Sequence, residues 1–503
     1  MNTTRHHQPA RVRLAPSPTG RTHLGNGRTA LYNYLLARQS GGQFILRIED
    51  TDRKRYQPDA EVELIESLRS LGLDWDEGPD IGGPHAPYHQ SQRKHIYQQY
   101  AQQLIAHGHA YYCFCSPARI ADLRREQQQN KAPLLYDGLC RTLTPTEAAR
   151  RIAAGEPHVV RFRTPQDGSI TSVDLLRGAI TVENRLLDDI ILVKSDGLAV
   201  YHLAAMVDDH LMQITHVLRG AEWLPTFPLH THIYHAFGWE QPVWVHLSLF
   251  LKPSGKGKMS KREAAGLLND GYSIFIKDLL EHGYLPEAVI NWVALMGWSY
   301  DDHTEFFTIP DLVDKFSLER LNPSPAAINF SKLDHFNGLH IRSLAVPDLT
   351  ARIKPIFLEA GYTVADETLL QVTPIIQERL VTLDDAVEKA GFFFEDTVSP
   401  QPNELVGKKM TPQESLLAAD RAYEILQDLP VLSHDTTEAP LRALADDLGL
   451  KAGQLFGILR VAVTGQKVSP PLLESMEILG KDIVLQRLQN AISILNTFPP
   501  AQV

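Results

Sequence analysis

The first half of the chain carries short apolar runs that alternate with helical patterns. Apolar runs at residues 12–15 and 44–48 predict buried strands, and apolar positions recur at helical spacing at 31–35 and 60–71. Two prolines and a glycine in residues 16–23 predict a loop between the first strand and the first helix. Strands that alternate with helices in this way indicate an α/β unit with a parallel sheet.

The α/β pattern is interrupted once and then resumes. Residues 112–188 are irregular, with a polar helical stretch at 119–129 and a strand-like run at 159–162, and we interpret them as an insertion. The pattern returns with strands expected at 190–193, 214–218 and 243–247 and a helix expected at 229–237. The pieces on the two sides of the insertion are therefore expected to build one sheet.

Helical patterns dominate beyond about residue 265. The clearest lie at 274–280, 287–295, 369–376 and 416–426. The C-terminal region is therefore predicted to be mostly α-helical. Periodicity alone does not distinguish a passive scaffold from an RNA-binding surface.

The composition is that of a large globular protein. At 503 residues the chain exceeds what one hydrophobic core supports, so three to five packed units are expected. The net charge of −11 argues against a surface coated in basic residues but is compatible with a local basic stripe along a phosphate backbone. No apolar run approaches the roughly 20 residues that cross a bilayer, so we expect a cytoplasmic protein.

The first chemical motif lies in residues 13–26, which read RLAPSPTGRTHLGN. A strand that runs through a turn into a helix places helix N-terminal amides at the carboxyl edge of the sheet, where they favour phosphate. Gly25 would let the backbone approach a nucleotide closely, and His23 could donate a hydrogen bond to phosphate oxygens. Taken alone, a histidine in a loop is more often a structural hydrogen-bonding group.

The second motif lies in residues 251–262, which read LKPSGKGKMSKR. Lysines that close over a triphosphate would neutralise the transferring phosphate and the leaving pyrophosphate. Taken alone, a run of cations in a loop is more often a solvated charged segment. The two motifs together favour a nucleotide site, because they lie in order at the two ends of one interrupted α/β unit.

These motifs resemble the two signatures of class I aminoacyl-tRNA synthetases, carried here by residues 23–26 and 258–262. Asn26 departs from the histidine that ends the commonest form of the first signature. Further similar blocks lie at residues 15–20, 47–52, 194–197, 207–210 and 218–223. With these blocks, the chain resembles bacterial-type glutamyl-tRNA synthetases over essentially its whole length.

The resemblance implies a class I Rossmann-like catalytic domain with an inserted acceptor-binding domain, followed by a mostly α-helical anticodon-binding half. The related glutaminyl enzymes typically carry β-barrels in the C-terminal half. We expect the catalytic domain in residues 1–111 and 189–264, the acceptor-stem-binding insertion in 112–188, a stem-contact helical domain in 265–335, and an anticodon-binding region in 336–503 with a subdomain boundary near 390.

The implied reaction joins L-glutamate to tRNA(Glu) in two steps. The glutamate α-carboxylate attacks the ATP α-phosphate, with Mg²⁺ accompanying ATP, and the glutamyl group then moves from the adenylate to a terminal ribose hydroxyl of the tRNA. The resemblance implies that activation requires bound tRNA, and a monomer is expected.

A selective glutamate pocket needs a fixed cation for the side-chain carboxylate and an anion for the α-amino group. The resemblance assigns Arg13 and Arg219 to the carboxylate, Glu49 to the ammonium group, and Ser17 and Tyr201 to the remaining hydrogen bonds. Each of these could instead form a surface ion pair or hydrogen bond.

Other site residues follow from the same matched motifs. The catalytic candidates are His23, Lys258 and Lys261. The ATP-binding candidates are Thr19, Gly25, Asn26, Met259 and Lys261. Arg47 and Arg55 are weaker candidates for the glutamate pocket. Residues 378–383 resemble the segment in which this family places an arginine that reads an anticodon base, so Arg379 is a candidate, although arginine is also frequent on helix surfaces. Trp223 could stack on adenine or simply pack.

All three cysteines fall in the insertion. Cys113 and Cys115 form a Cys-x-Cys pair, and Cys140 follows after 24 residues. Such a set can hold a structural zinc ion through thiolates, and three buried free thiols are the alternative. Similar zinc-binding synthetases have a histidine two residues after the last cysteine, where this chain has Thr142, so Tyr136 or a water is the candidate fourth ligand.

Three alternative functions are open at this point. The enzyme could have relaxed specificity and also charge tRNA(Gln) with glutamate. The chain could instead be a catalytically silent tRNA-binding paralogue, which the presence of His23, Lys258 and Lys261 disfavours. A dinucleotide-dependent dehydrogenase is disfavoured because the first turn lacks the G-x-G-x-x-G pattern.

Overall fold

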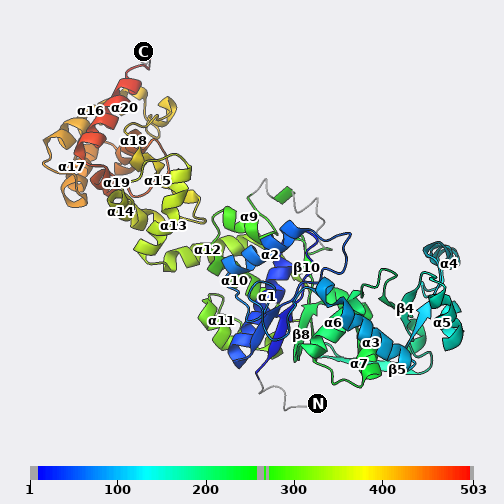
Figure 1. Ribbon diagram of the computed structural model, residues 1–503. Helices are drawn as coiled ribbons and strands as arrows, with labels where there is room; N and C mark the ends of the chain where they lie inside the picture. Colours follow the sequence, from blue (N-terminus) through cyan, green and yellow to red (C-terminus); the bar gives the residue numbers. More distant parts are fainter. Residues whose placement is uncertain (1–8, 258–265, 268–270, 499–503) are drawn as a thin grey trace. The chain divides into compact units, whose positions relative to one another are not determined.

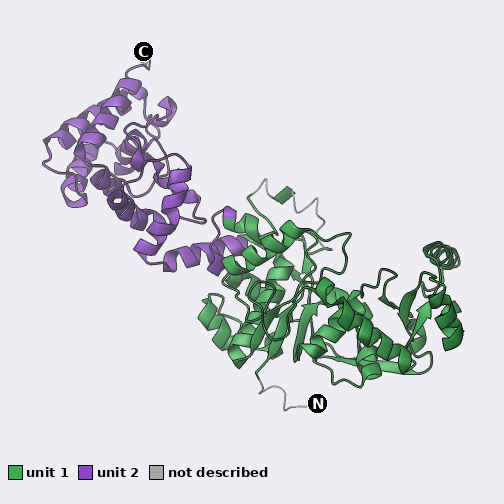
Figure 2. Cartoon of the chain, in the orientation of Figure 1, with its two compact units in different colours: residues 1–280, 289–330 green, residues 281–288, 331–503 purple. Residues whose placement is uncertain are grey.

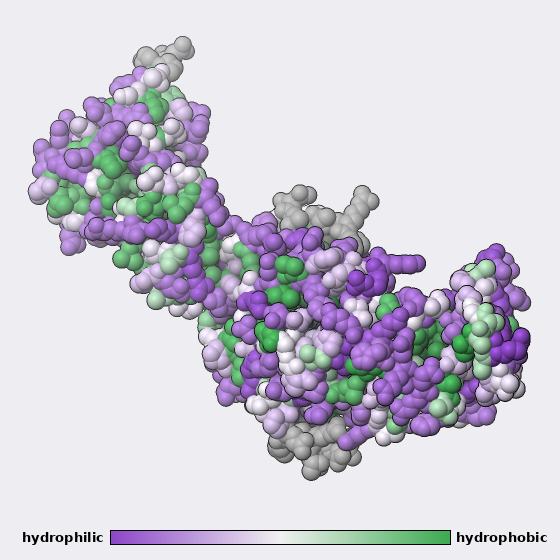
Figure 3. Space-filling view, in the orientation of Figure 1, coloured by the Kyte–Doolittle hydropathy of each residue, from purple (hydrophilic) through white to green (hydrophobic). Residues whose placement is uncertain are grey.

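The computed structural model describes residues 9–257, 266–267 and 271–498. The chain divides into two compact units (Figure 2). Unit 1 contains Met1–Leu280 and Val289–Phe330, and unit 2 contains Glu281–Ala288 and Ser331–Val503. No helix among the described residues is long and apolar enough to cross a membrane. Hydrophilic residues cover most of the face shown in Figure 3, with hydrophobic residues scattered among them.

Unit 1 contains the strands and the helices that follow them (Figure 1). Its strands are β1 (Arg11–Leu14), β2 (Gln43–Leu46), β3 (Ala110–Cys113), β4 (Val159–Phe162), β5 (Ser169–Asp174), β6 (Gly178–Glu183), β7 (Ile191–Val193), β8 (His216–Gly220), β9 (Val243–Leu247), β10 (Phe250–Leu251) and β11 (Ala326–Ala327). Its helices are α1 (Leu24–Ser40), α2 (Pro58–Ser70), α3 (Lys94–Ala106), α4 (Pro117–Gln129), α5 (Pro145–Ala153), α6 (Tyr201–Leu211), α7 (Phe227–Phe237), α9 (Ile276–Glu281), α10 (Pro286–Leu295) and α11 (Ile309–Lys315).

Parallel strands from both sides of the insertion lie together. β1 pairs with β2 in parallel, and β8 pairs with β9 in parallel. Thr215, directly before β8, connects the two pairs: its backbone N–H donates to Arg11 O (2.9 Å), and its hydroxyl accepts from Arg11 N (2.8 Å). The prediction that both pieces build one sheet is wrong, because β1 and β2 form one sheet and β8 and β9 belong to another, and Thr215 links the two sheets through its hydrogen bonds to Arg11. The strand predicted at 190–193 is β7, which pairs with β4 of the insertion instead.

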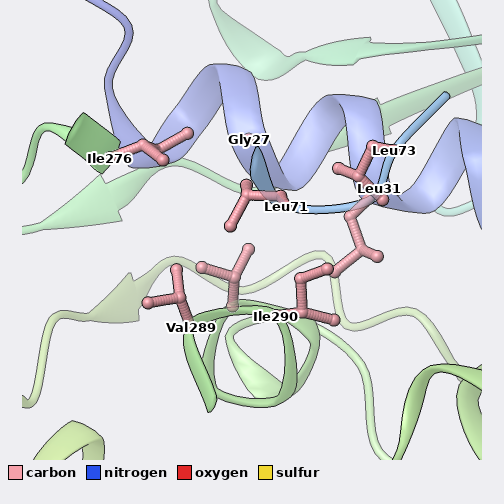
Figure 4. Close-up of a pocket in the computed structure, with 8 residues that line it drawn as sticks. Gly27, Leu31, Leu71, Leu73, Ile276, Val289 and Ile290 are labelled. Carbon is pink, nitrogen blue, oxygen red and sulfur yellow. The ribbon is translucent and has the colours of Figure 1, made fainter. Parts of the chain in front are cut away.

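Helix α1 packs against α9 and α10 through small and apolar side chains. They line a small pocket with residues of the segment after α2 (Figure 4): Gly27, Leu31, Leu71, Leu73, Ile276, Val289, Ile290 and Val293. A Cβ atom at Gly27 would lie 2.9 Å from the Ile276 side chain, so the glycine permits this close approach. The packing fixes the N-terminal end of α1, which carries the first motif.

The strands of the insertion are shared between two sheets. β3, β4 and β7 form an antiparallel sheet. β5 and β6 form an antiparallel hairpin that joins the sheet of β8 and β9, because Asp174 at the end of β5 pairs in parallel with Trp244 of β9. The last residue of β5 therefore lies beside a strand of the α/β core.

Unit 2 is built of helices throughout its described part. They are α12 (Phe330–Ser343), α13 (Val346–Glu359), α14 (Asp366–Gln377), α15 (Asp385–Ala390), α16 (Pro412–Asp428), α17 (His434–Asp447), α18 (Ala452–Thr464), α19 (Leu472–Leu479) and α20 (Lys481–Leu495). Their apolar faces share one core, which includes Leu369, Leu426 and Leu488. Buried Arg487 donates to the carbonyl oxygens of Val463 and Phe392, both at 2.7 Å. The prediction of a mostly helical C-terminal region is confirmed.

Candidate active site

The first motif forms the loop after β1 and the first turn of α1. His23 caps the helix, and its Nδ1 atom accepts a hydrogen bond from Gly25 N at 3.0 Å. In a neutral ring this bond leaves the proton on Nε2, so His23 presents a hydrogen-bond donor at that atom. A Cβ atom at residue 25 would lie 2.8 Å from the His23 ring and would displace it, so this ring position requires glycine at residue 25. Asn26, in the same turn, is half-buried.

The other candidate residues of the two motifs divide into two groups: Ser17, expected to bind glutamate, and Thr19, expected to bind ATP, lie in the described loop, whereas the catalytic and ATP-binding candidates of the second motif do not. Ser17 is exposed and Thr19 is half-buried, and Thr19 N donates to Ser17 O within the loop (2.9 Å). Lys258, Met259 and Lys261 lie outside the described residues. The described part of their segment ends at Gly257, whose carbonyl oxygen accepts a hydrogen bond from Lys252 N (3.0 Å).

Arg13 and Arg47 share one buried carboxylate. Arg13 Nε and Nη2 lie 3.0 and 3.3 Å from the two oxygens of Asp209, and Arg47 Nη1 lies 2.8 Å from Asp209 Oδ1. All three side chains are buried. Burial alone would raise the pKa of Asp209, but the charges of Arg13 and Arg47 lower it below its usual value. Asp209 is therefore a fixed anion that neutralises much of the positive charge of these arginines.

Glu49 follows β2 at the carboxyl edge of the sheet. It is buried, and its carboxylate lies 3.3 Å from Arg47 Nη2. Burial raises the pKa of Glu49 to about 7, although the charges of Arg47 and Arg13 act in the opposite direction. A bound ammonium group would favour the ionised form of this carboxylate.

Arg219 on β8 is held by neutral groups. Its Nε lies 3.0 Å from His246 Nε2, its Nη1 lies 3.0 Å from Tyr201 Oη, and its Nη2 lies 3.0 Å from His230 Nδ1. Arg219 is 4% exposed, and among the residues that the structure describes no carboxylate lies within ion-pairing distance of it. Its guanidinium therefore keeps a positive charge that no neighbouring carboxylate compensates.

The residues assigned to glutamate converge on one region. Burial raises the pKa of Tyr201, and the charges of Arg219, Glu49 and Arg13 all act on that hydroxyl group. The Tyr201 ring stacks on Trp223, with ring centroids 3.9 Å apart. Arg13, Glu49 and Arg219 come from the ends of β1, β2 and β8, where the carboxyl edge of a parallel sheet gathers ligand-binding groups. Ser17 is exposed in the loop that follows β1.

A second buried carboxylate, Asp208, was not predicted from the sequence. Asp208 accepts hydrogen bonds from Arg93 Nε (2.8 Å), Gln90 Nε2 (2.9 Å) and Tyr97 Oη (2.7 Å). It is fully buried on α6 beside Asp209. The available signal was the pair of adjacent carboxylates directly after the apolar stretch Leu203–Val207, since buried charges need partners.

The three cysteines of the insertion lie together. Their sulfur atoms are all within 4.8 Å of one another, and Cys115 Sγ lies 3.6 Å from Cys140 Sγ. Tyr136 Oη lies 3.5 Å from Cys113 Sγ and 3.3 Å from Cys115 Sγ, and it accepts a hydrogen bond from Cys140 N (2.9 Å). Burial raises the pKa of Cys115 to about 11.

The remaining candidates are surface residues. Arg55 is exposed and pairs with Asp52 at 2.6 Å. Arg379 is exposed in the turn after α14, where its backbone N–H donates to Ile376 O (2.8 Å). Burial lowers the pKa of Arg460, and the positive charge of Arg379 lowers it further, so two cations lie near each other on unit 2.

Comparison with known proteins places this arrangement in a family. Residues 9–335 match the model of the catalytic domain of class I tRNA synthetases (E and Q), and residues 348–492 match that of an anticodon binding domain. A glutamate–tRNA ligase of Dehalococcoides mccartyi is 45% identical over 97% of this chain and 99% of its own length. One of Roseiflexus sp. (strain RS-1) is 46% identical over 98% of each chain.

A solved structure shows the same fold. The crystal structure of a glutamate tRNA ligase from Elizabethkingia meningosepticum, in complex with its amino acid, aligns with 97% of this chain and 99% of its own chain. The TM-score is 0.89 and the sequence identity is 35%. The chain belongs to the class I tRNA synthetases of the E and Q branch, with a catalytic domain followed by an anticodon-binding domain.

Proposed function

We infer that the protein is a glutamate–tRNA ligase, which uses ATP to join L-glutamate to tRNA(Glu). The observation that carries this inference is the buried guanidinium of Arg219, which keeps its positive charge and, like the ionisable Glu49, acts on the hydroxyl group of Tyr201. A ligand with an anionic side chain and an ammonium group compensates both charges. The printed names of the relatives support the same substrate.

Glutamine fits this pocket poorly. Its neutral side chain would leave the Arg219 charge uncompensated in a buried site, which is costly. Arg13 plays a different part from Arg219, because Asp209 already neutralises much of its charge. We assign Arg219 to the side-chain carboxylate and Arg13 to hydrogen bonding beside it.

The first step forms a glutamyl adenylate. An oxygen of the glutamate α-carboxylate attacks the α-phosphorus of ATP, and the bond to the bridging oxygen breaks to release pyrophosphate. In the family this reaction uses Mg²⁺, which neutralises the phosphate oxygens. We assign the His23 Nε2–H group to donate to a phosphate oxygen, and the helix end around Gly25 and Asn26 favours the same negative charge. We assign Lys258 and Lys261 to the leaving pyrophosphate.

The second step transfers the acyl group. A terminal ribose hydroxyl of the tRNA attacks the carbonyl carbon of the adenylate, the bond to the phosphate oxygen breaks, and AMP leaves. Trp223 stacks on Tyr201 at this site, and we propose that it also borders the adenine ring. In unit 2 we propose that exposed Arg379 contacts an anticodon base, because an arginine can hydrogen-bond the edge of an unstacked base.

The cysteine cluster fits a structural zinc ion. Tetrahedral Zn–S bonds of about 2.3 Å place sulfur atoms about 3.8 Å apart, and Cys115 and Cys140 are already 3.6 Å apart. Tyr136 Oη lies close to two of the sulfurs, so we propose Cys113, Cys115, Cys140 and Tyr136 as the ligands. The ion would hold the insertion together and take no part in the reaction.

Aminoacylation of separate tRNA isoacceptors tests the function. Purified tRNA(Glu) and tRNA(Gln) are each incubated with ATP, Mg²⁺ and labelled glutamate or glutamine. We expect charging of tRNA(Glu) with glutamate and none with glutamine. Charging of tRNA(Gln) with glutamate would identify the relaxed-specificity form. No glutamate-dependent charging and no pyrophosphate exchange with tRNA present would support the silent paralogue and overturn the proposal.

A further inference from the structure

The buried arginine on β8 differs from the other arginines of the pocket in the charge of its partners. Arg13 and Arg47 each contact a carboxylate, Asp209. Arg219 contacts two imidazole nitrogens and one phenol oxygen instead. Its carbon Cζ also lies 4.7 Å from the centre of the Trp244 ring, which adds a further uncharged contact.

The protonation of the two histidines follows from this geometry. A guanidinium can only donate hydrogen bonds, so His246 Nε2 and His230 Nδ1 must both accept. His246 therefore carries its proton on Nδ1, which lies 2.7 Å from Asp174 Oδ2 and donates to it. If Nε2 carried a proton, two N–H donors would face each other, and the hydrogen bond from Arg219 Nε could not form.

The same reasoning extends through the second histidine. Because His230 Nδ1 accepts from Arg219, its proton is on Nε2, which lies 2.9 Å from His202 Nδ1 and donates to it. Burial lowers the pKa of His230 well below its usual value and that of His202 to about 4, which keeps both rings neutral. All three partners of Arg219 are thereby uncharged acceptors in the neutral pH range.

We propose that His230 and His246 are positioning residues, which orient the Arg219 guanidinium through neutral acceptor atoms and so preserve its positive charge for the side-chain carboxylate of the amino acid. This proposal rests on the proposed function. Carboxylates in their places would orient the guanidinium equally well, but they would neutralise it. The neutral histidines therefore act as specificity determinants for an acidic substrate although they act through another residue.

The test compares neutral and acidic replacements at the same positions. His230→Asn keeps an acceptor near the place of Nδ1, and His246→Gln keeps one near the place of Nε2. His230→Asp and His246→Glu have similar sizes and add a negative charge. The KM for glutamate and the KM for ATP are measured by tRNA charging, together with the thermal midpoint of each variant.

We expect the neutral variants to raise the KM for glutamate only about 3- to 5-fold, and the acidic variants to raise it by a further factor of about 10 to 100. The KM for ATP should change less than about 2-fold in all four. His232→Asn is the matched control, because His232 is buried on the same helix but lies against Asn184 (2.9 Å). It should leave the KM for glutamate unchanged.

Equal glutamate KM values for the neutral and acidic variants would overturn the proposal, as would a rise that follows the thermal midpoint alone. Ring ¹⁵N NMR of the unchanged protein gives a second test that does not depend on the folding of variants. Both rings should be neutral, with the proton on Nδ1 of His246 and on Nε2 of His230, and a protonated ring at pH 7 would overturn the proposal. If the unchanged protein fails to charge tRNA with glutamate, the proposed function fails instead.

Discussion

Arg47 and Asp209 form a buried ion pair, with Arg47 Nη1 2.8 Å from Asp209 Oδ1, although 162 residues separate them in the chain. Arg47 follows β2, and Asp209 lies on α6 beyond the insertion. Burial alone would lower the pKa of Arg47, but the nearby carboxylates, Asp209 first among them, raise it above its usual value. The pair therefore joins the two pieces of the catalytic unit beside Arg13 and Glu49.

Replacing Asp209 by asparagine should destabilise the protein strongly. Asp209→Asn leaves the buried charges of Arg13 and Arg47 without their shared partner, and loss of one member of a buried pair costs about 3–5 kcal/mol. Urea unfolding of unit 1, followed by the fluorescence of its tryptophans, measures the change. Asp122→Asn is the control, because the Asp122–Arg125 pair is exposed and should contribute less than about 1 kcal/mol. Equal effects of the two changes would contradict this account.

Glutamate binding should depend on pH through Glu49. Burial raises its pKa to about 7, so the carboxylate that we assign to the substrate ammonium group is progressively protonated as the pH falls below 7. We expect the KM for glutamate to fall as the pH rises through about 7 and then to level off. Glu49→Gln should give a higher KM that is flat in this range. A pH dependence that survives in this variant would assign the titration to another group.

The raised pKa of Glu49 also makes the stability of the fold depend on pH. A higher pH favours glutamate binding but lowers the stability. Folded Glu49 holds its proton up to about pH 7, whereas the unfolded chain releases it near the usual value of 4.5. Between these values the folded state binds more protons, so this residue makes the protein less stable as the pH rises. The loss of stability between pH 5 and 7 should therefore be smaller in Glu49→Gln, as measured by urea unfolding.

Replacing Arg219 by glutamine or by lysine should lower kcat/KM for glutamate. Arg219→Gln removes the buried charge opposite the substrate carboxylate, which typically costs about 2–5 kcal/mol and corresponds to a fall in kcat/KM for glutamate of about 30-fold to several thousand-fold. Arg219→Lys keeps the charge but cannot reach Tyr201, His230 and His246 together, so it should also lose at least about 10-fold. The exposed Arg150 offers a control, and Arg150→Gln should retain the original kcat/KM.

The cysteine cluster should hold about one zinc ion per chain. Elemental analysis of the purified protein measures the content, and Cys140→Ser should lose the metal and lower the thermal midpoint of the insertion. Tyr136→Phe distinguishes the two candidate fourth ligands. The affinity of the variant for zinc is measured by competition with a chelator. A weaker zinc affinity supports the phenol as a ligand, and an unchanged affinity supports a water. Three free thiols with no metal in the unchanged protein would contradict the site.

The sequence predicted those parts of the fold whose signal is local. β9 and β4 have the predicted bounds, because short apolar runs between turn residues are typical of buried strands. α16 begins four residues earlier than predicted, since Thr411 caps it and Pro412 occupies its first turn. The gathering of the three cysteines was also predictable, because their number and spacing are specific.

The sequence did not reveal the relations that depend on tertiary packing. The partners of Asp208 lie 111 to 118 residues away, and the hydrogen-bonded neighbours of Arg219 come from three separate elements. The sequence also contains no signal that shows which ring nitrogen of a histidine in an apolar segment accepts a hydrogen bond. The pairing of β5 with β9 was hidden for the same reason, because strand pairing between distant segments leaves no local pattern.

That pairing links the hairpin of β5 and β6 to the arginine that we assign to the amino acid. Asp174, the last residue of β5, accepts hydrogen bonds from both the backbone N–H (3.0 Å) and the ring (2.7 Å) of His246, which in turn holds Arg219. The hairpin therefore contributes, through Asp174 and His246, to the orientation of the Arg219 guanidinium. A molecule that binds the hairpin would therefore be connected to the proposed glutamate site through two side chains, Asp174 and His246, and its binding could change the affinity for glutamate.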